Sequence, residues 1–198
     1  QEAIEVLQAA LARKPDFAIA HNNLGNVFWH QRMLEQAGAA YEAAIAINPR
    51  FVEALNGIGN VRKEQGLREA ALDHYTRALA IDPNSAVAHC NIGTIRCEQG
   101  LVVEALEHFS NAVALDPTWP LPHSNLLLTL HYADEIDVHR MGLEQRRWNE
   151  RHASRFVSEA QLHSGDCSSG RRLRVGYISA DLRNHAVACF FEPLLSAH

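Results

Sequence analysis

Asparagine side chains recur along much of the chain at intervals that could place them in one row. Asn26 and Asn60 are 34 residues apart, Asn91 and Asn125 are also 34 apart, and Asn23 precedes Asn91 by twice that interval. A carboxamide carries a hydrogen-bond donor and an acceptor, so it can pair with a peptide backbone whatever the side chains of that peptide are. We predict that these five residues bind an extended polypeptide; the alternative is a solvated polar face.

His185 is the second candidate for chemistry. It follows a β-rich run over residues 172–180 and precedes a helical pattern over residues 186–198, which together read as the strand, turn and helix that open an α/β domain. Open α/β sheets place their sites at the carboxyl ends of strands. A helix N-terminus also favours anionic groups such as a diphosphate. This position makes His185 a candidate site residue; the alternative is that it only caps the helix.

Other histidines do not lead us to assign a metal. His21, His89 and His123 keep the 34-residue interval, which favours packing roles. The histidine and acidic residues over 131–139 resemble a ligand cluster, but a helix end followed by a turn explains them more simply. The sequence also contains no Gly-rich phosphate loop. We therefore predict no metal ion and no tightly bound cofactor.

The interval between the asparagines is also the period of an internal repeat in the sequence. Prolines, glycines, alanines and aromatic rings recur every 34 residues at Pro15, Pro49, Pro83, Pro117, Gly25, Gly59, Gly93, Ala37, Ala71, Ala105, Tyr41, Tyr75 and Phe109. This pattern resembles the tetratricopeptide repeat, a unit of two antiparallel helices. The resemblance implies stacked helix pairs that form a superhelix with a concave surface. The asparagines fall on one face of the first helices, and Gly57 leaves a gap in their row.

The ends of the helices in each unit are also predictable. The first helix should end in a turn at Arg32, Gly66 or Gly100, where glycine supplies a left-handed C-cap. The second helix should stop at an Asn-Pro or Asp-Pro pair, because the residue before proline avoids helical angles. Glycine inside a helix costs ~1 kcal/mol relative to alanine. The recurring Gly59 and its equivalents therefore indicate that another helix crosses too closely for a methyl group.

The whole chain is predicted to be mostly α-helical. We expect tetratricopeptide repeats over residues 1–119, transitional helices over 120–162, a polar linker over 163–171 and the start of an α/β domain over 172–198. The first segment begins inside a repeat and the last ends inside a helix, so both ends are expected to be cut.

Charge and composition exclude some classes of partner. Residues 1–122 carry 9 Lys and Arg against 14 Asp and Glu, a net charge of −5, and no basic stripe indicates nucleic-acid binding. No stretch approaches the ~20 apolar residues of a membrane span. The four cysteines are scattered, which is typical of reduced thiols in a cytoplasmic protein.

The run LRVGYISADLRNH over residues 173–185 is the most specific part of the sequence. It resembles the entry to the catalytic region of the O-linked N-acetylglucosamine transferases, including their bacterial and Spindly-type relatives. The matching elements are the strand LRVGY, the S-x-D at its end and the Asn184-His185 pair. Many relatives have proline next, where this chain has Ala186.

The resemblance implies a two-lobed, metal-independent glycosyltransferase. Such an enzyme transfers a sugar from a nucleotide sugar to Ser or Thr hydroxyls of proteins, and UDP-GlcNAc is the expected donor, bound mainly by a lobe beyond this chain. The resemblance also implies that His185 lies near the acceptor and is catalytic. The expected partners are acceptor polypeptides on the concave repeat surface and the nucleotide sugar.

Two alternatives remain open at the level of sequence. The chain could belong to a tetratricopeptide-repeat adaptor without enzymatic activity, in which residues 172–198 start another α/β module. It could also belong to an O-fucosyltransferase of the same family.

Overall fold

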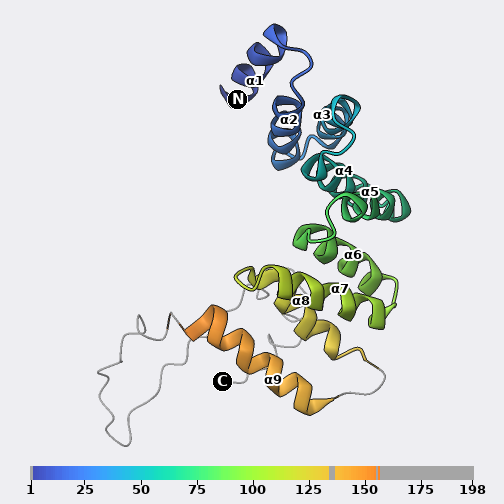
Figure 1. Cartoon of the computed structure of the whole chain (residues 1–198), viewed down its shortest axis with the longest axis vertical. Helices are drawn as coiled ribbons and strands as arrows, with labels where there is room; N and C mark the ends of the chain where they lie inside the picture. Colours follow the sequence, from blue (N-terminus) through green and yellow to red (C-terminus); the bar gives the residue numbers. More distant parts are fainter. Residues whose placement is uncertain (1, 134–136, 155, 157–198) are drawn as a thin grey trace, which may run out of the picture. The chain divides into compact units, whose positions relative to one another are not determined.

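The computed structural model describes residues 2–133, 137–154 and 156. Every regular element within these ranges is helical (Figure 1), so the mostly α-helical prediction is confirmed for them. The chain divides into two units, residues 1–160 and 161–198, and all described residues lie in the first. The predicted linker, the predicted strand and helix over 172–198, and His185 all lie outside the described residues.

Three helix pairs follow one another with the predicted period. Their first and second helices in order are α2 (Ala18–His30) and α3 (Leu34–Ile47), α4 (Val52–Glu64) and α5 (Arg68–Ile81), and α6 (Ala86–Glu98) and α7 (Val102–Leu115). The helix α1 (Glu2–Arg13) precedes the pairs, and α8 (Pro120–Leu130) follows them. Helices α2, α4, α6 and α8 each contact the next member of this series as well as their neighbours in sequence. These four helices therefore form one layer, here called the A layer, as expected for stacked repeats.

The helix ends follow the local chemistry of the sequence. Arg32, Gly66 and Gly100 have φ values of 61°, 79° and 76°, which confirms the left-handed turn after each first helix. Each second helix stops before its Asn-Pro or Asp-Pro pair. The side-chain oxygen of that Asn or Asp accepts a hydrogen bond of 3.0–3.1 Å from the N–H two residues further on. This bond closes the turn into the next repeat.

Aromatic rings from the second helices fill the core of each pair. Tyr41, Tyr75 and Phe109 are buried almost completely. A Cβ atom at Gly25 would lie 2.7 Å from the ring of Tyr41, and one at Gly93 would lie 2.9 Å from Phe109. The close approach predicted at the recurring glycines is therefore present. Its cause is an aromatic ring from the partner helix.

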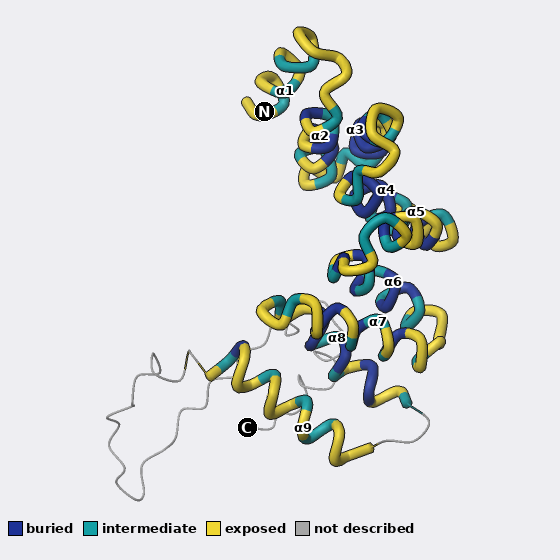
Figure 2. The backbone as a smooth tube through the Cα atoms, viewed as in Figure 1, coloured by how far each residue is buried: buried dark blue, intermediate teal, exposed yellow. Residues whose placement is uncertain are grey.

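The last described helices lie within residues 120–162, where the sequence predicts transitional helices. The helix α9 (Val138–Trp148) continues as a π-helix over Asn149–Ala153. None of the residues of α9 is buried, and Figure 2 shows it largely exposed. The helix packs on α8, and a buried polar network described below fixes that contact. Among the described helices, none combines the length and the apolar character that crossing a membrane would require.

Candidate functional site

The five predicted asparagines all lie in the A layer. Asn23 and Asn26 lie on α2, Asn60 on α4, Asn91 on α6 and Asn125 on α8. The first two side chains are exposed and the other three are half-buried. The 34-residue period thus brings all five onto successive helices of a single layer, although the environments of their carboxamides differ.

Two of these asparagines are hydrogen-bonded to the core tyrosines. The Tyr41 hydroxyl donates a hydrogen bond of 2.7 Å to Oδ1 of Asn26, and Tyr75 makes the equivalent 2.7 Å bond to Asn60. The bond occupies the amide oxygen and leaves the NH₂ group as the available donor. This pairing was not predicted from the sequence. Its signal was present, because the same 15-residue separation joins an Asn to a Tyr in both repeats.

The remaining asparagines divide into free and bonded side chains. Among the hydrogen bonds of the described residues, none involves the side chain of Asn23 or Asn91. Asn125 hydrogen-bonds the thiol of Cys90. Burial raises the pKa of that thiol to about 11, so Cys90 stays neutral at physiological pH. Asn23 and Asn91 are therefore the two residues of the row whose carboxamides are wholly available.

The ring of Tyr41 fills the space beside Gly57, the glycine at the predicted gap in the asparagine row. A Cβ atom at this position would lie 2.5 Å from Cε1 and 2.6 Å from Cζ of Tyr41. The same ring also lies against Gly25 of its own repeat. Gly57 contributes no carboxamide to the row, and the glycine makes room for an aromatic ring of the preceding repeat.

A pocket of about 510 Å³ opens beside Asn125, between α6, α7 and α8. Thr94 and Asn125 line it together with apolar residues of α7 and α8. The Thr94 hydroxyl donates to the carbonyl oxygen of Cys90 at 2.9 Å. This pocket adjoins the predicted binding row, and no motif in the sequence had indicated it.

Two of the three histidines that keep the 34-residue interval, His21 and His89, hydrogen-bond the turn before their helix. The Nε2 atom of His21 donates to the carbonyl oxygen of Pro15 at 2.8 Å, and His89 makes the equivalent contact with Pro83 at 3.3 Å. His123 follows the same interval but turns toward α9. Within the described ranges, no group of three or more His, Cys, Asp or Glu side chains is arranged to hold a metal ion.

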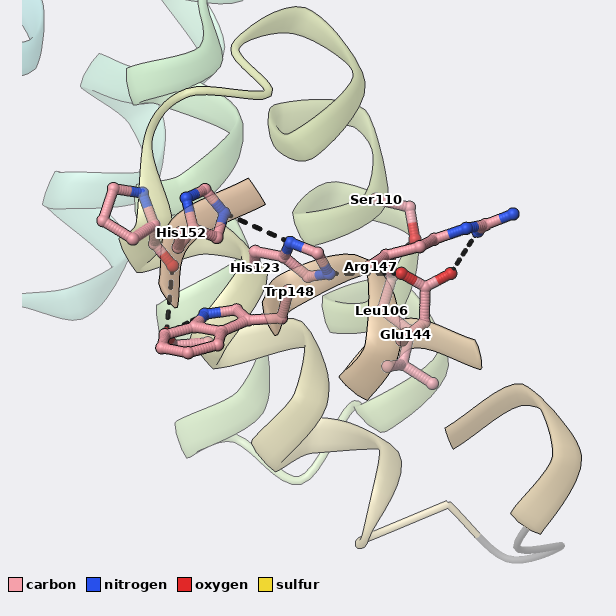
Figure 3. Close-up of polar contacts among 9 residues, drawn as sticks. Leu106, Ser110, His123, Glu144, Arg147, Trp148 and His152 are labelled. Atoms are coloured by element: carbon pink, nitrogen blue, oxygen red, sulfur yellow. Dashed lines mark hydrogen bonds and ion pairs between the residues drawn. The ribbon is translucent and has the colours of Figure 1, made fainter. Parts of the chain in front are cut away.

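His123 is the centre of a buried polar network (Figure 3). Its Nε2 lies 3.2 Å from Oε2 of Glu144, and its Nδ1 lies 3.4 Å from Nε2 of His152. Arg147 donates to the other oxygen of Glu144 at 2.6 Å. Burial lowers the pKa of His123, while the Glu144 carboxylate opposes that shift. The network attaches α9 to α8 and explains how a helix without a buried residue stays in place.

Comparison with known proteins agrees with the geometry of the helix pairs. Sequence models of the tetratricopeptide repeat match residues 1–50 and 52–85. With the stacked pairs described above, these matches show that the chain carries tetratricopeptide repeats. No curated protein sequence matches the chain.

Solved structures provide two kinds of neighbour. An O-GlcNAc transferase mutant from Thermobaculum terrenum is 28% identical with a TM-score of 0.71, and the match covers 91% of this chain and 35% of the transferase. A crystal structure of MamA protein is 17% identical with a TM-score of 0.65, covering 80% of this chain and 86% of MamA. The likeness to MamA shows the fold alone. This chain spans about a third of the length of the transferase.

Proposed function

We propose that the chain is the repeat region and first catalytic segment of a protein O-glycosyltransferase. The enzyme transfers N-acetylglucosamine from a nucleotide sugar, UDP-GlcNAc, to Ser or Thr side chains. The observation that carries the proposal is the 28% identity to the Thermobaculum terrenum O-GlcNAc transferase over 91% of this chain. The run over residues 173–185 also supports it, because it resembles the start of a catalytic region.

The repeats bind the acceptor polypeptide along the A layer. Asn23 and Asn91 offer complete carboxamides, while Asn26 and Asn60 offer their NH₂ groups because tyrosine hydroxyls occupy their oxygens. An NH₂ donor pairs with a peptide carbonyl, a group that every residue of an extended polypeptide carries. Such a row holds a backbone without requiring one sequence, which suits an enzyme that acts on many proteins.

His185 acts at the acceptor side of the catalytic cleft. An imidazole there can accept the proton of the attacking hydroxyl or position the acceptor and the phosphates. A transfer assay on the full-length parent with UDP-GlcNAc tests the proposal directly. The variant His185→Ala should lower turnover by about 10²-fold or more with an unchanged melting temperature. The variant His185→Asn keeps hydrogen bonding but cannot take up a proton near neutral pH, so it separates the two roles.

Three results of this assay would change the assignment. Turnover within a fewfold of wild type in His185→Ala would leave His185 as a helix cap. Transfer from GDP-fucose in place of UDP-GlcNAc would establish the fucosyltransferase alternative. An absence of transfer from either donor by the full-length parent would favour the adaptor. Residues 1–198 alone should transfer no sugar, because the donor is expected to bind a lobe beyond them and its diphosphate would lack stabilisation.

A further inference from the structure

The pocket between α6, α7 and α8 differs in character from the rest of the A layer. Its apolar walls come from three helices and the turn after α8, and they are formed by Cys97, Val102, Phe109, Leu128 and Tyr132. Thr94 and Asn125 supply polar groups at its edge, and Glu98 is its only charged lining residue. A volume of about 510 Å³ falls within the range of ligand pockets, ~300–1,000 Å³.

An ion pair spans the equivalent place one repeat earlier. Arg68 Nε lies 2.9 Å from Oε2 of Glu98 and joins two successive repeats. The residues 34 positions later are Val102 and Tyr132. The repeat therefore places an apolar pair, Val102 and Tyr132, where the preceding interface has a salt bridge.

The hydrogen bond between a tyrosine hydroxyl and an asparagine amide, present in the earlier repeats, is also absent at this pocket. Tyr75 and Asn60 form it in the second repeat, whereas the third has Phe109 and Thr94 at the same positions. Phe109 has no hydroxyl, and the Thr94 hydroxyl is used by the backbone of its own helix. The edge of the Phe109 ring is thus left to line the pocket as an apolar surface.

The apolar residues around this pocket are exposed well beyond what packing requires. Leu128 is 56% exposed and Tyr132 is 59% exposed, and Leu121 on the same helix is 51% exposed. These side chains are too exposed to be part of the core of the repeats. Leu128 and Tyr132 line the pocket, and exposed apolar side chains at the wall of a hollow are typical of a binding site.

We propose that this pocket, here called the Phe109 pocket, binds a large apolar side chain of the acceptor polypeptide. The inference deepens the proposed function and rests on it, because it assumes that the A layer binds polypeptide. Asn125 lines the pocket and Asn91 lies on the neighbouring helix α6, and their carboxamides hold the backbone on either side of the inserted side chain. Residues 1–122 carry a net charge of −5, so the bound segment has Lys or Arg next to its Phe, Trp or Leu.

Two matched peptides test the proposal by fluorescence polarisation. Both are fluorescein-labelled Gly/Ser dodecapeptides with one lysine on each side of the centre, and they differ only in a central Phe or Ala. Burying the Phe side chain should make the first peptide bind at least ~10-fold more tightly. In Leu128→Asn this ratio should fall toward one. The matched control Val103→Asn, at an exposed apolar residue of α7, should keep the ratio.

The outcomes separate this inference from the proposed function. If wild type binds both peptides equally, the Phe109 pocket does not select side chains, and the proposal is overturned while binding by the A layer stands. Replacement of Asn23 and Asn91 by alanine should weaken both peptides to the same extent, which reports on the A layer alone. If neither peptide binds, both the pocket and the A-layer assignment are refuted.

Alkylation of Cys97 provides an independent measurement of what occupies the pocket. In a Cys167→Ser/Cys189→Ser background, a maleimide should reach Cys97, while Cys90 is only 2% exposed and has a raised pKa. The Phe peptide should slow this alkylation and the Ala peptide should not. If Cys97 fails to react in the free protein, another part of the chain covers the pocket, and that result overturns the proposal. Alkylation at an unchanged rate with bound Phe peptide overturns it as well.

Discussion

The hydroxyl of Tyr75 lies 2.7 Å from Oδ1 of Asn60 and donates a hydrogen bond to it. The two residues come from the two helices of one repeat, α5 and α4. The bond joins a ring that fills the core to a carboxamide at the surface we propose for polypeptide binding. It fixes the orientation of that carboxamide and keeps its NH₂ group available. Packing and binding thus depend on the same pair of side chains.

Alkaline pH should destabilise the repeats through these tyrosines. Burial raises the pKa of Tyr41 to about 12 and raises that of Tyr75 further. A folded-state pKa above the unfolded value of about 10 gives stability that is complete below pH 10 and lost as the pH rises. Between pH 10 and 12 the free energy of unfolding should fall by up to ~1.4 kcal/mol per pH unit for each tyrosine.

Urea unfolding at pH 9, 10 and 11 measures this slope. The variant Tyr41→Phe should show a shallower slope than wild type. The variant Tyr132→Phe changes an exposed tyrosine and should leave the slope as it is. Equal slopes in wild type and Tyr41→Phe would contradict the assignment of the slope to the buried ring.

Gly59→Ala should lower the melting temperature. The added Cβ would lie 2.8 Å from Cδ1 of Tyr75, with another atom of the ring closer still, so the ring must shift. Overpacking of this kind costs ~1–3 kcal/mol, more than the helix propensity of alanine returns. Gly38→Ala is the matched control, because its Cβ would meet Val61 at 3.7 Å, an ordinary contact. If both variants melt alike, the ring does not constrain residue 59.

Replacing Asn23 and Asn91 by alanine should weaken binding of acceptor proteins without changing helix content. Neither carboxamide is hydrogen-bonded to another described residue, so their loss should leave the fold intact and remove contacts with the bound backbone. A loss of about 5- to 30-fold corresponds to two hydrogen bonds of ~0.5–1 kcal/mol each. Asn111→Ala, an exposed asparagine on α7, controls for surface amides in general. Unchanged affinity in the double variant would reduce the row to a solvated surface.

Mild acid should also destabilise the protein, through buried histidines. Burial lowers the pKa of His123, His74 and His108 below the unfolded value of about 6.5. The unfolded state therefore binds protons first, and stability that is complete above pH 6.5 is lost as the pH falls. Around His123, Glu144 opposes this effect, while His152 and Arg151 add to it.

Melting temperatures between pH 7.5 and 5 test this second pH dependence. The melting temperature should fall less with pH in His123→Gln than in wild type, whatever the stability of the variant at pH 7.5. The exposed His139 on α9 provides the control, and His139→Gln should keep the wild-type slope. If His123→Gln keeps the wild-type dependence of melting temperature on pH, the buried network is not the cause of that dependence.

The sequence predicted those parts of the fold that depend on neighbouring residues. Asn48, Asp82 and Asp116 end their helices because proline follows each of them, and glycine at 66 and 100 adopts the positive φ that a C-cap needs. The period alone also placed the asparagines on successive helices of the A layer. Both inferences need only local propensity and a spacing, which a single sequence contains.

Contacts between residues distant in the chain could not be predicted from a single sequence. The sequence showed that Gly57 leaves a gap in the asparagine row, but nothing next to it in the sequence shows that Tyr41 lies against it. The partners of His123 come from α9 and the π-helix after it, and the period of the repeats gives no information on these elements. The walls of the Phe109 pocket come from three different helices, so no local pattern predicts it.

The position of Tyr41 between two glycines has a consequence for how the molecule unfolds. Its ring lies against Gly25 in its own repeat and against Gly57 in the next one. One side chain therefore contributes both to the intrinsic stability of a repeat and to its coupling with a neighbour. Melting of the first repeat withdraws the ring from the second and exposes part of its interior. The cooperative unit of folding is thus longer than the 34 residues that recur in the sequence.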